Sequence, residues 1–321
     1  MSIENPRAFV FPGQGTQAHI PELVSRLFSP DNPREVFRTS ERIYEDTKDI
    51  LGADLRKISE SGSVAELTQP GIIEPAIMTA SIALLEVLKE HYKVKPDVVA
   101  GHSMGQVTAS YAAEALTLEQ AQLLLKGRGE YMTRAGILNP GTMVAILGLN
   151  YDEVLEICAK TEEALARPGS VPANINGPTH IVVSGEIDAI TYISQIVRDK
   201  GKKAIELKVN VAAHSYFMEP ARQEMKLLLQ RIKVSDPLIP IVDNSIADYV
   251  ETKEGVAAGL IDAMTAKVLW ADSITRMTEN GVREFEEVGP GNVLSNTIRR
   301  IDPSLSVSHG VQRIPIYSAT K

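Results

Sequence analysis

The chain has 321 residues, a length that suits one large α/β unit carrying a smaller insertion. Its formal net charge of −8 disfavours nucleic acid as a partner, because contacts with phosphates require a basic surface. The sequence has no apolar run of the roughly 18 residues that span a membrane and no recognisable secretory signal, so we expect a cytoplasmic protein without a membrane partner.

Apolar segments alternate with helical patterns along the chain. The strand-like segments are rich in valine and isoleucine and span 8–11, 97–101, 143–149, 180–185, 203–209 and 240–244. The helix-like stretches span 75–92, 105–116, 118–136, 151–166, 187–200, 218–232 and 291–300. This alternation predicts a mostly parallel sheet with helices on both faces.

The region from 138 to 207 has a different order. It reads strand, helix, strand, helix, strand, with strong turns at 139–141 and 176–178, and the segment 166–178 is a candidate for one more strand. This order fits a small ferredoxin-like α+β subdomain. We therefore predict two units: a large α/β catalytic domain formed by residues 1–137 and 208–321, and an inserted small subdomain formed by residues 138–207.

The only cysteine, Cys158, lies in the helical pattern 151–166, where we expect a small core residue. A single cysteine can form neither an intrachain disulfide nor a cysteine-based metal cluster. The cysteine count therefore fits a reducing compartment and predicts no metal site of that kind.

The segment Gly101-His102-Ser103-Met104-Gly105 follows a predicted strand and opens a predicted helix. That context is the one a G-x-S-x-G nucleophile elbow requires, because the turn is tight and needs small residues two positions either side of the serine. The hydroxyl then lies near a helix N-terminus, where amide groups and the helix dipole favour developing negative charge. We predict Ser103 as a nucleophile in an α/β-hydrolase-like large domain and expect His102 to be structural.

A serine hydroxyl needs a nearby base to act as a nucleophile at neutral pH. The chain has six histidines: His19, His91, His102, His180, His214 and His309. Apart from His102, which is part of the elbow itself, His214 is the histidine that lies between a predicted strand, 203–209, and a predicted helix, 218–232. In a parallel sheet such a loop lies at the same edge as the elbow, so we predict His214 as the general base.

Four segments occur in a fixed order along the chain: FVFPGQGTQ at 9–17, GHSMG at 101–105, AHS at 213–215 and EVGPGNVLSNTIRR at 287–300. Together they resemble malonyl-CoA:acyl-carrier-protein transacylases and the acyltransferase domains of polyketide synthases. The resemblance extends over nearly the whole chain, from about residue 7 to residue 301. Four ordered motifs are far more specific than the elbow alone.

The resemblance implies a role for each of five residues. Ser103 is similar to the family's nucleophile and His214 to its general base. The main-chain N–H groups of Gln14 and Met104 correspond to the oxyanion hole, which binds the tetrahedral intermediate of acyl transfer. Arg128 resembles the arginine that grips the free carboxylate of a malonyl group, which a guanidinium can bind with two parallel hydrogen bonds.

The implied reaction moves a malonyl-type acyl group from coenzyme A, through a serine ester, to the phosphopantetheine thiol of an acyl carrier protein. Acyl-CoA is a substrate here, and the resemblance implies no metal or redox cofactor. The pathway would be fatty acid or polyketide synthesis, and we expect a monomer. An acidic carrier protein would need a basic patch on this protein for docking. The candidates are the pair Lys202 and Lys203 and the pair Arg299 and Arg300. The alternative is that both pairs are simply solvated surface residues.

Several positions depart from the commonest family pattern. Gln106 follows the elbow where relatives often have glutamate, and Glu74 precedes Pro-Ala where relatives often have glutamine. Our hypothesis is that these two side chains lie close and exchange roles; otherwise Glu74 brings negative charge to the acyl pocket, which would weaken malonate binding or suit an acyl group bearing an amine. The family orients its histidine through a main-chain carbonyl, which we expect near Ala263.

Ala213 replaces the phenylalanine or serine that malonyl-specific relatives often carry before the histidine. The smaller side chain leaves room for a bulkier acyl group, so methylmalonyl, longer and aminoacyl substrates stay open. Three further functions remain as alternatives. They are acyl transfer from one carrier to another, hydrolysis of acyl groups from carrier proteins, and a non-catalytic docking platform in a synthase assembly.

Overall fold

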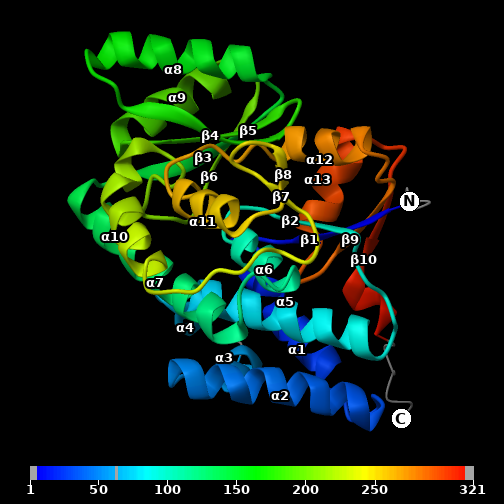
Figure 1. Ribbon diagram of the computed structural model, residues 1–321. Helices are drawn as coiled ribbons and strands as arrows, with labels where there is room; N and C mark the ends of the chain where they lie inside the picture. The colour runs from blue at the N-terminus through cyan, green and yellow to red at the C-terminus, as the bar shows by residue number, and fades with distance from the viewer. Residues whose placement is uncertain (1–5, 62–63, 315–321) are drawn as a thin grey trace.

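The structure, a computed structural model, describes residues 6–61 and 64–314. It contains two β-sheets with helices packed around them (Figure 1). The larger sheet has six strands in the order β10-β9-β1-β2-β7-β8. Their bounds are β1 (Arg7–Phe11), β2 (Val98–Gly101), β7 (Ile241–Asp243), β8 (Asp248–Val250), β9 (Glu284–Glu287) and β10 (Ser306–His309). All neighbouring pairs are parallel except β7 and β8.

Helices cover both faces of the large sheet, as the alternating pattern predicts (Figure 1). Strand β1 directs Phe9 and Phe11 to the core shared with helices α1, α5, α6 and α7, and it directs Ala8 and Val10 to the core shared with α12 and α13. The helices around this sheet are α1 (Ile20–Leu27), α2 (Arg34–Leu51), α3 (Leu55–Ser61), α4 (Val64–Leu67), α5 (Ile73–Glu90), α6 (Gly105–Ala112), α7 (Leu118–Leu138), α10 (Glu219–Leu229), α11 (Lys253–Asp262), α12 (Trp270–Glu279) and α13 (Val293–Ile301).

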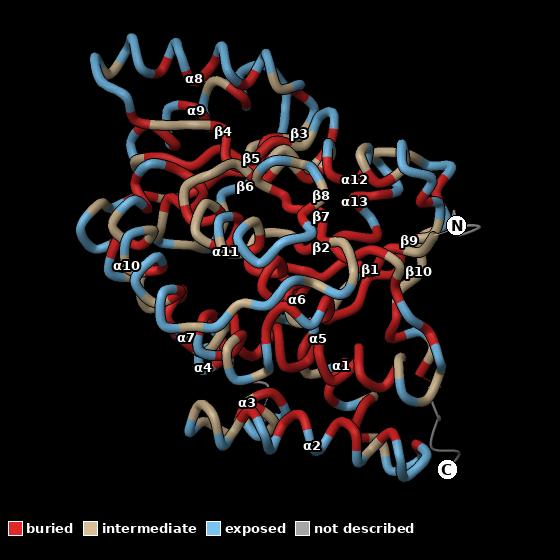
Figure 2. Tube along the Cα trace, in the orientation of Figure 1, coloured by how far each residue is buried: buried red, intermediate tan, exposed pale blue. Residues whose placement is uncertain are grey.

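Helix α5 runs through the centre of the large unit and is buried along nearly all of its length (Figure 2). Its sequence is apolar on every side rather than amphipathic, which is the pattern of a helix enclosed by its neighbours. Within the part of the chain that the structure describes, none of the helices combines the length and the apolar character that a membrane crossing requires.

The second sheet has four antiparallel strands in the order β4-β5-β3-β6. The strands are β3 (Thr142–Leu147), β4 (Ser170–Gly177), β5 (His180–Gly185) and β6 (Lys203–Glu206), and the helices are α8 (Tyr151–Leu165) and α9 (Ile187–Asp199). The chain order strand-helix-strand-strand-helix-strand with this pairing is the ferredoxin-like topology, which confirms the predicted fold class. The candidate strand within 166–178 is β4. The exact residues at which the two units separate stay a prediction.

The two units are closely joined. One face of the small sheet packs against α8 and α9 through Val144, Ile146 and Cys158, whereas Met143 and Val182 belong to the core of the large unit. A main-chain hydrogen bond also joins the two units. The amide of Ile175 in β4 donates to the carbonyl of Val268, 2.8 Å away, in the segment just before α12. The small sheet therefore packs against the large unit through α12, α13 and the segment that precedes α12.

The segment 203–209 forms β6 only as far as Glu206, and β6 pairs antiparallel with β3 at an edge of the small sheet. This strand therefore belongs to the small sheet, as its place within 138–207 predicts. The argument that His214 follows a strand of the same parallel sheet as the elbow is wrong, because the strand before it belongs to the other sheet.

Candidate active site

The turn between β2 and α6 carries Ser103. A Cβ atom on Gly101 would lie 2.0 Å from the carbonyl carbon of Gly105, and a Cβ atom on Gly105 would lie 2.2 Å from the carbonyl oxygen of Phe11. Only glycine therefore fits at the two positions that flank the turn. Ser103 has a φ of 55°, a left-handed conformation that a non-glycine residue adopts at a cost of order 1–3 kcal/mol and that is common at functional sites.

Ser103 and His214 meet although 111 residues separate them: the Oγ atom lies 2.7 Å from Nε2 of the imidazole. The other ring nitrogen, Nδ1, lies 3.2 Å from the carbonyl oxygen of Ala266. Nδ1–H donates to that carbonyl, so Nε2 is free to accept the serine proton. The orienting carbonyl is thus that of Ala266, three residues after Ala263, near which we expected it; the main chain of Ala263 also interacts with the imidazole, and Ala263 lines the adjoining cavity.

His214 is held as a neutral imidazole. Its side chain is buried, and this burial, together with the charge of Arg128, lowers the pKa of His214 to about 3. Removal of water disfavours the charged form of a histidine, and a nearby positive charge does the same. The ring is therefore in its basic form at neutral pH, as a general base must be.

The small sheet positions the loop that carries His214. Leu207 donates its amide to the carbonyl of Met143 in β3, and Thr142 Oγ1 donates to the carbonyl of Val209 at 3.0 Å. Ser184 in β5 donates its hydroxyl to the carbonyl of Ala213. His214 thus reaches Ser103 because the small sheet packs against the large unit, not because both residues follow strands of one parallel sheet.

The segment after β1 lies against the elbow. A Cβ atom on Gly13 would be 2.7 Å from the carbonyl oxygen of His102 and 3.5 Å from Cβ of Ser103. Gln14, the next residue, is thereby beside the nucleophile, and its side-chain Nε2 donates to Oε1 of Glu74 at 2.9 Å. Met104 directly follows Ser103 at the start of α6. These positions fit two main-chain donors near the serine, and their role in an oxyanion hole stays a prediction.

Arg128 and Glu74 form a buried ion pair. Arg128 lies on α7, Glu74 lies in the first turn of α5, and their side chains are 5% and 0% exposed. Nη1 of Arg128 pairs with Oε1 of Glu74, while Nη2 donates to Oγ of Ser103 at 3.3 Å. Burial raises the pKa of Glu74, and the guanidinium of Arg128 opposes that shift. The arginine therefore lies at the nucleophile and already has an anionic partner.

Glu74 and Gln106, which both depart from the family pattern, form hydrogen bonds with different residues. Gln106 Oε1 accepts a hydrogen bond from Nδ2 of Asn244 at 3.1 Å, and Asn244 also donates to the carbonyl of Gly101. Among the described residues no hydrogen bond joins Gln106 to Glu74, so the structure gives no support to an exchange of roles. Asn244, which follows β7 and donates hydrogen bonds at both ends of the elbow, was not singled out from the sequence; only its place as the last residue of the predicted strand 240–244 could have indicated it.

His102 is structural, as expected. It is partly buried, its Nε2 lies 2.7 Å from Oδ1 of Asn176 in β4, and its ring lies edge to face against Trp270 at a centroid distance of 5.4 Å. Burial lowers the pKa of His102. The residue next to the nucleophile thus ties the elbow to the small sheet.

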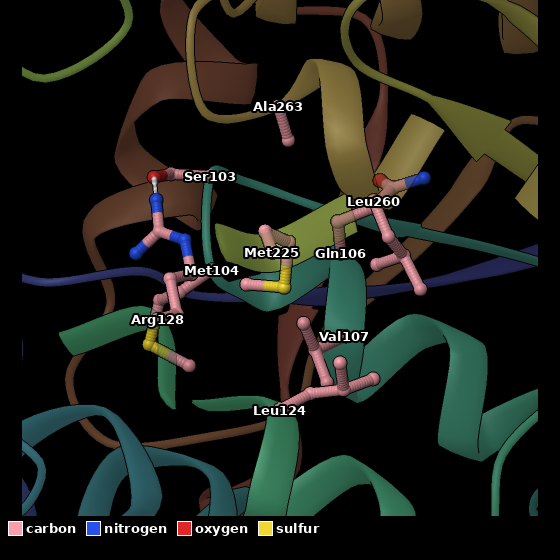
Figure 3. A pocket seen from close by; sticks show the side chains of 9 residues that line it. All are labelled: Ser103, Met104, Gln106, Val107, Leu124, Arg128, Met225, Leu260 and Ala263. Carbon is pink, nitrogen blue, oxygen red and sulfur yellow. Dashed lines mark hydrogen bonds between the residues drawn. The ribbon is translucent and has the colours of Figure 1, made fainter. Parts of the chain in front are cut away.

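A small cavity adjoins the nucleophile (Figure 3). Its volume is about 10 Å³, the room of a single water molecule. The guanidinium of Arg128 points at the Ser103 hydroxyl from one side (Figure 3), and the other lining residues are Met104, Gln106, Val107, Leu124, Met225, Leu260 and Ala263. Ala213 is buried but is not among the described residues that line this cavity, so its predicted effect on acyl-group size stays untested.

The other predicted residues lie outside the site. Cys158 is buried in α8 against the small sheet, and burial raises its pKa to about 11, as expected of an inert core thiol. The candidate docking residues Lys202, Lys203, Arg299 and Arg300 are all exposed. Arg299 donates to the carbonyl of Val307 at 2.6 Å. Their part in carrier binding stays a prediction.

A serine on a sharp strand-to-helix turn, within hydrogen-bond reach of a neutral imidazole that a carbonyl orients, is the arrangement that nucleophilic acyl transfer requires. The parallel sheet and the G-x-S-x-G turn are those of α/β enzymes with a serine nucleophile. Fold and geometry together therefore define the class as a serine-dependent acyl-transfer protein.

Comparisons with known proteins give the family. Residues 8–310 match the family described as "Acyl transferase domain". The chain is 33% identical over 301 residues to the malonyl CoA-acyl carrier protein transacylase of Bacillus subtilis, covering 93% of this chain and 91% of that protein. It is also 33% identical over 296 residues to the polyketide biosynthesis malonyl CoA-acyl carrier protein transacylase PksC of the same organism, covering 91% and 96%.

Solved structures agree. The malonyl CoA-acyl carrier protein transacylase of Coxiella burnetii has a TM-score of 0.87 at 29% identity, with 97% of this chain and 95% of that chain covered. MCAT from Streptococcus pneumoniae has a TM-score of 0.84 at 33% identity, with 94% and 95% covered. The chain belongs to the acyl transferase family, which confirms the resemblance seen in the four motifs.

Proposed function

We propose that this protein transfers a malonyl-type acyl group from coenzyme A, through an ester on Ser103, to the phosphopantetheine thiol of an acyl carrier protein. The observation that carries the proposal is the 2.7 Å contact between Ser103 Oγ and His214 Nε2. The names of the relatives, malonyl CoA-acyl carrier protein transacylases that span nearly the whole chain, support the donor and the acceptor. Because one relative is named for polyketide biosynthesis, we propose either fatty acid or polyketide synthesis as the pathway.

The first half-reaction forms the ester. Ser103 Oγ attacks the thioester carbonyl while its proton passes to Nε2 of His214, and the carbonyl electron pair moves onto oxygen. In our proposal the main-chain N–H groups of Gln14 and Met104 bind this oxyanion; loss of one such donor typically costs about 3–4 kcal/mol of transition-state stabilisation. The C–S bond then breaks, and the imidazolium returns the proton to the departing thiolate of coenzyme A.

The second half-reaction is the reverse with a different thiol. His214 takes the proton of the phosphopantetheine thiol, the sulfur attacks the ester carbonyl of Ser103, and the proton returns to Oγ as the C–O bond breaks. The carbonyl of Ala266 holds the ring in one tautomer through both steps by accepting from Nδ1–H. These residues supply the chemistry that both half-reactions need.

Arg128 is the proposed contact for the free carboxylate of the acyl group. Its guanidinium lies 3.3 Å from the nucleophile through Nη2, the distance at which it can reach a substituent of the acyl ester. A guanidinium binds a carboxylate with two parallel hydrogen bonds, whereas an acetyl group would leave it without that partner. The exposed pairs at 202–203 and 299–300 remain our candidates for carrier docking.

The test of this function is detection of the acyl-enzyme by intact mass across a panel of acyl thioesters. We expect malonyl-CoA to add one malonyl group to the wild type and none to Ser103→Ala. Ser110→Ala is the matched control, because Ser110 is a buried serine on α6, the helix that follows the elbow, and its hydroxyl donates to the carbonyl of Gln106. This variant should acylate normally.

The fate of the acyl-enzyme separates transfer from hydrolysis. A transferase loses the acyl group slowly to water and rapidly to holo-carrier protein. Equal loss with and without carrier would show a hydrolase, and the absence of any adduct on Ser103 with every thioester would leave only the docking platform. A preference for acetyl-CoA over malonyl-CoA in both wild type and Arg128→Lys would remove Arg128 from the proposed role.

A further inference from the structure

We propose that Glu74 determines acyl-group specificity by competing with the substrate carboxylate for Arg128, so that the pocket accepts uncharged, hydrogen-bond-donating acyl groups more readily than an unpaired arginine would allow. The inference rests on the proposed function, because it concerns the same acyl ester on Ser103. It goes further in assigning a role to a residue that departs from the family pattern.

The position of Glu74 is the first reason. Its carboxylate is fully buried at the start of α5 and contacts Arg128 from the adjacent helix α7. The same guanidinium donates to Oγ of Ser103 at 3.3 Å. A single guanidinium therefore separates the carboxylate of Glu74 from the atom that becomes the acyl ester.

The charge balance is the second reason. An arginine buried without a partner would be an uncompensated positive charge, which the carboxylate of a malonyl group would neutralise. Here Glu74 already neutralises it. A malonyl carboxylate must then share one guanidinium with a second carboxylate, and two like charges repel strongly where water is excluded. An uncharged acyl group meets no such repulsion.

The hydrogen-bond inventory is the third reason. Oε1 of Glu74 accepts from both Arg128 and Gln14, whereas Oε2 is buried and has no hydrogen-bond partner among the described residues. A carboxylate oxygen enclosed in this way is an acceptor that lacks a donor. A hydroxyl group on an acyl chain that reaches past the guanidinium would supply one, and an ionised carboxylate would not.

The experiment compares loading of Ser103 by malonyl-CoA, acetyl-CoA and 3-hydroxypropionyl-CoA in the full-length wild type and in Glu74→Gln. Glutamine keeps the size of the side chain and removes the charge. We expect the ratio of kcat/KM for malonyl over acetyl to rise about tenfold or more, mainly through a lower KM for malonyl-CoA, since tenfold is the effect of one modest charge interaction. Loading by 3-hydroxypropionyl-CoA should fall relative to acetyl-CoA.

Two further variants isolate the charge. Glu74→Asp keeps a carboxylate, so its ratio of kcat/KM for malonyl-CoA over acetyl-CoA should be closer to that of the wild type than to that of Glu74→Gln. Glu86→Gln removes another buried glutamate of α5, one that contacts Lys89 and Tyr111 rather than the site. It should leave the ratio unchanged, and a rise there equal to that of Glu74→Gln would overturn the inference.

The outcomes also distinguish this inference from the proposed function. If malonyl-CoA loads the wild type and Glu74→Gln with an unchanged ratio to acetyl-CoA, the role of Glu74 is wrong and the function stands. If only Glu74→Gln accepts malonyl-CoA, the role stands and malonyl is not the natural substrate. If neither accepts it, both fail. Should Glu74→Gln not fold, preference of the wild type for acetyl-CoA over 3-hydroxypropionyl-CoA would still refute the inference.

Discussion

Ser103 and His214 share an uncommon backbone conformation, with φ angles of 55° and 58°. Neither residue is glycine, and left-handed residues of this kind persist only where the surroundings fix them. The close packing of Gly101 and Gly105 fixes the backbone around Ser103. Hydrogen bonds from the small sheet fix the loop around His214. The strain directs the hydroxyl and the imidazole toward one another.

The burial of His214 predicts how stability depends on pH. Its pKa is about 3 in the folded protein and about 6.5 in the unfolded chain, so between these values only the unfolded state binds the proton. The stabilisation is complete above pH 6.5 and is lost as the pH falls toward 3. From pH 6.5 to pH 5 this residue should cost about 2 kcal/mol.

Urea unfolding at pH 7.5 and pH 5.0 checks this. The wild type should lose about 2 kcal/mol more of its unfolding free energy over that interval than His214→Gln, which has no group to protonate there. Equal losses in the two proteins would mean that the imidazole is hydrated or already charged in the folded state.

At the scale of single residues, sequence motifs singled out Ser103, His214 and Arg128, which the structure brings together, because each stands in a recognisable local pattern; their roles stay predictions. The motifs did not predict that Arg128 is paired with Glu74. The two residues are 54 positions apart, and their contact depends on how α5 packs against α7. The sequence placed the orienting carbonyl only near Ala263, and the carbonyl of Ala266 lies 3.2 Å from Nδ1 because the end of α11 decides which carbonyl faces the ring.

At the scale of elements, the turn between β2 and α6 is the part that sequence reasoning described most fully. Gly105→Ala should disable it, because the new Cβ atom would lie 2.2 Å from the carbonyl oxygen of Phe11 and both groups belong to rigid main chain. Such overpacking typically costs about 1–3 kcal/mol. We expect a loss of stability of that size and a loss of acyl-enzyme formation of at least tenfold.

Gly177→Ala is the control for the turn. A Cβ atom there would come no closer than 3.8 Å to its neighbours, so thermal unfolding and acylation should match the wild type. If Gly105→Ala acylates at the normal rate, the tight packing of β1 against the elbow does not set the position of Ser103.

Strand β9 shows why some elements escaped prediction. Its sequence is EFEE, and three glutamates in four residues are typical of an exposed loop or helix rather than of a central strand. Yet Glu286 and Glu287 are fully buried. Arg313 pairs with Glu286, and the amides of Leu294 and Ser295 at the start of α13 donate to Glu287. The groups that pair with these buried glutamates lie elsewhere in the chain, so the local sequence of β9 does not indicate that it forms a strand.

At the scale of the whole molecule, the site is shared between the two sheets. The large sheet supplies the nucleophile, and the small sheet fixes the loop of the base. Sequence alternation predicted both units, and the turn residues predicted the ferredoxin-like order of the smaller one. The strand order of the large sheet could not be predicted, because β9 and β10 join it from the last forty residues or so, β9 beside β1 and β10 at the edge beside β9.

The hydrogen bond between His102 and Asn176 offers a test of this joint construction. It links the elbow to β4 at 2.7 Å, and Asn176→Ala would leave a buried imidazole N–H without an acceptor. That loss typically costs about 1–3 kcal/mol. Because the small sheet also holds the loop of His214, we expect acylation of Ser103 by malonyl-CoA to slow about tenfold as the distance between base and nucleophile becomes less well defined.

Asn150→Ala separates the loss of this link from a general loss of stability. Asn150 caps α8 in the same small unit by accepting from the amide of Glu153 at 3.0 Å, and removal of such a cap costs about 1 kcal/mol. Its effect on unfolding should approach that of Asn176→Ala, but its acylation rate should stay near the wild-type value. If both variants slow acylation in proportion to their loss of stability, the small sheet contributes to folding and not to the alignment of His214, and the division of labour between the two sheets is wrong.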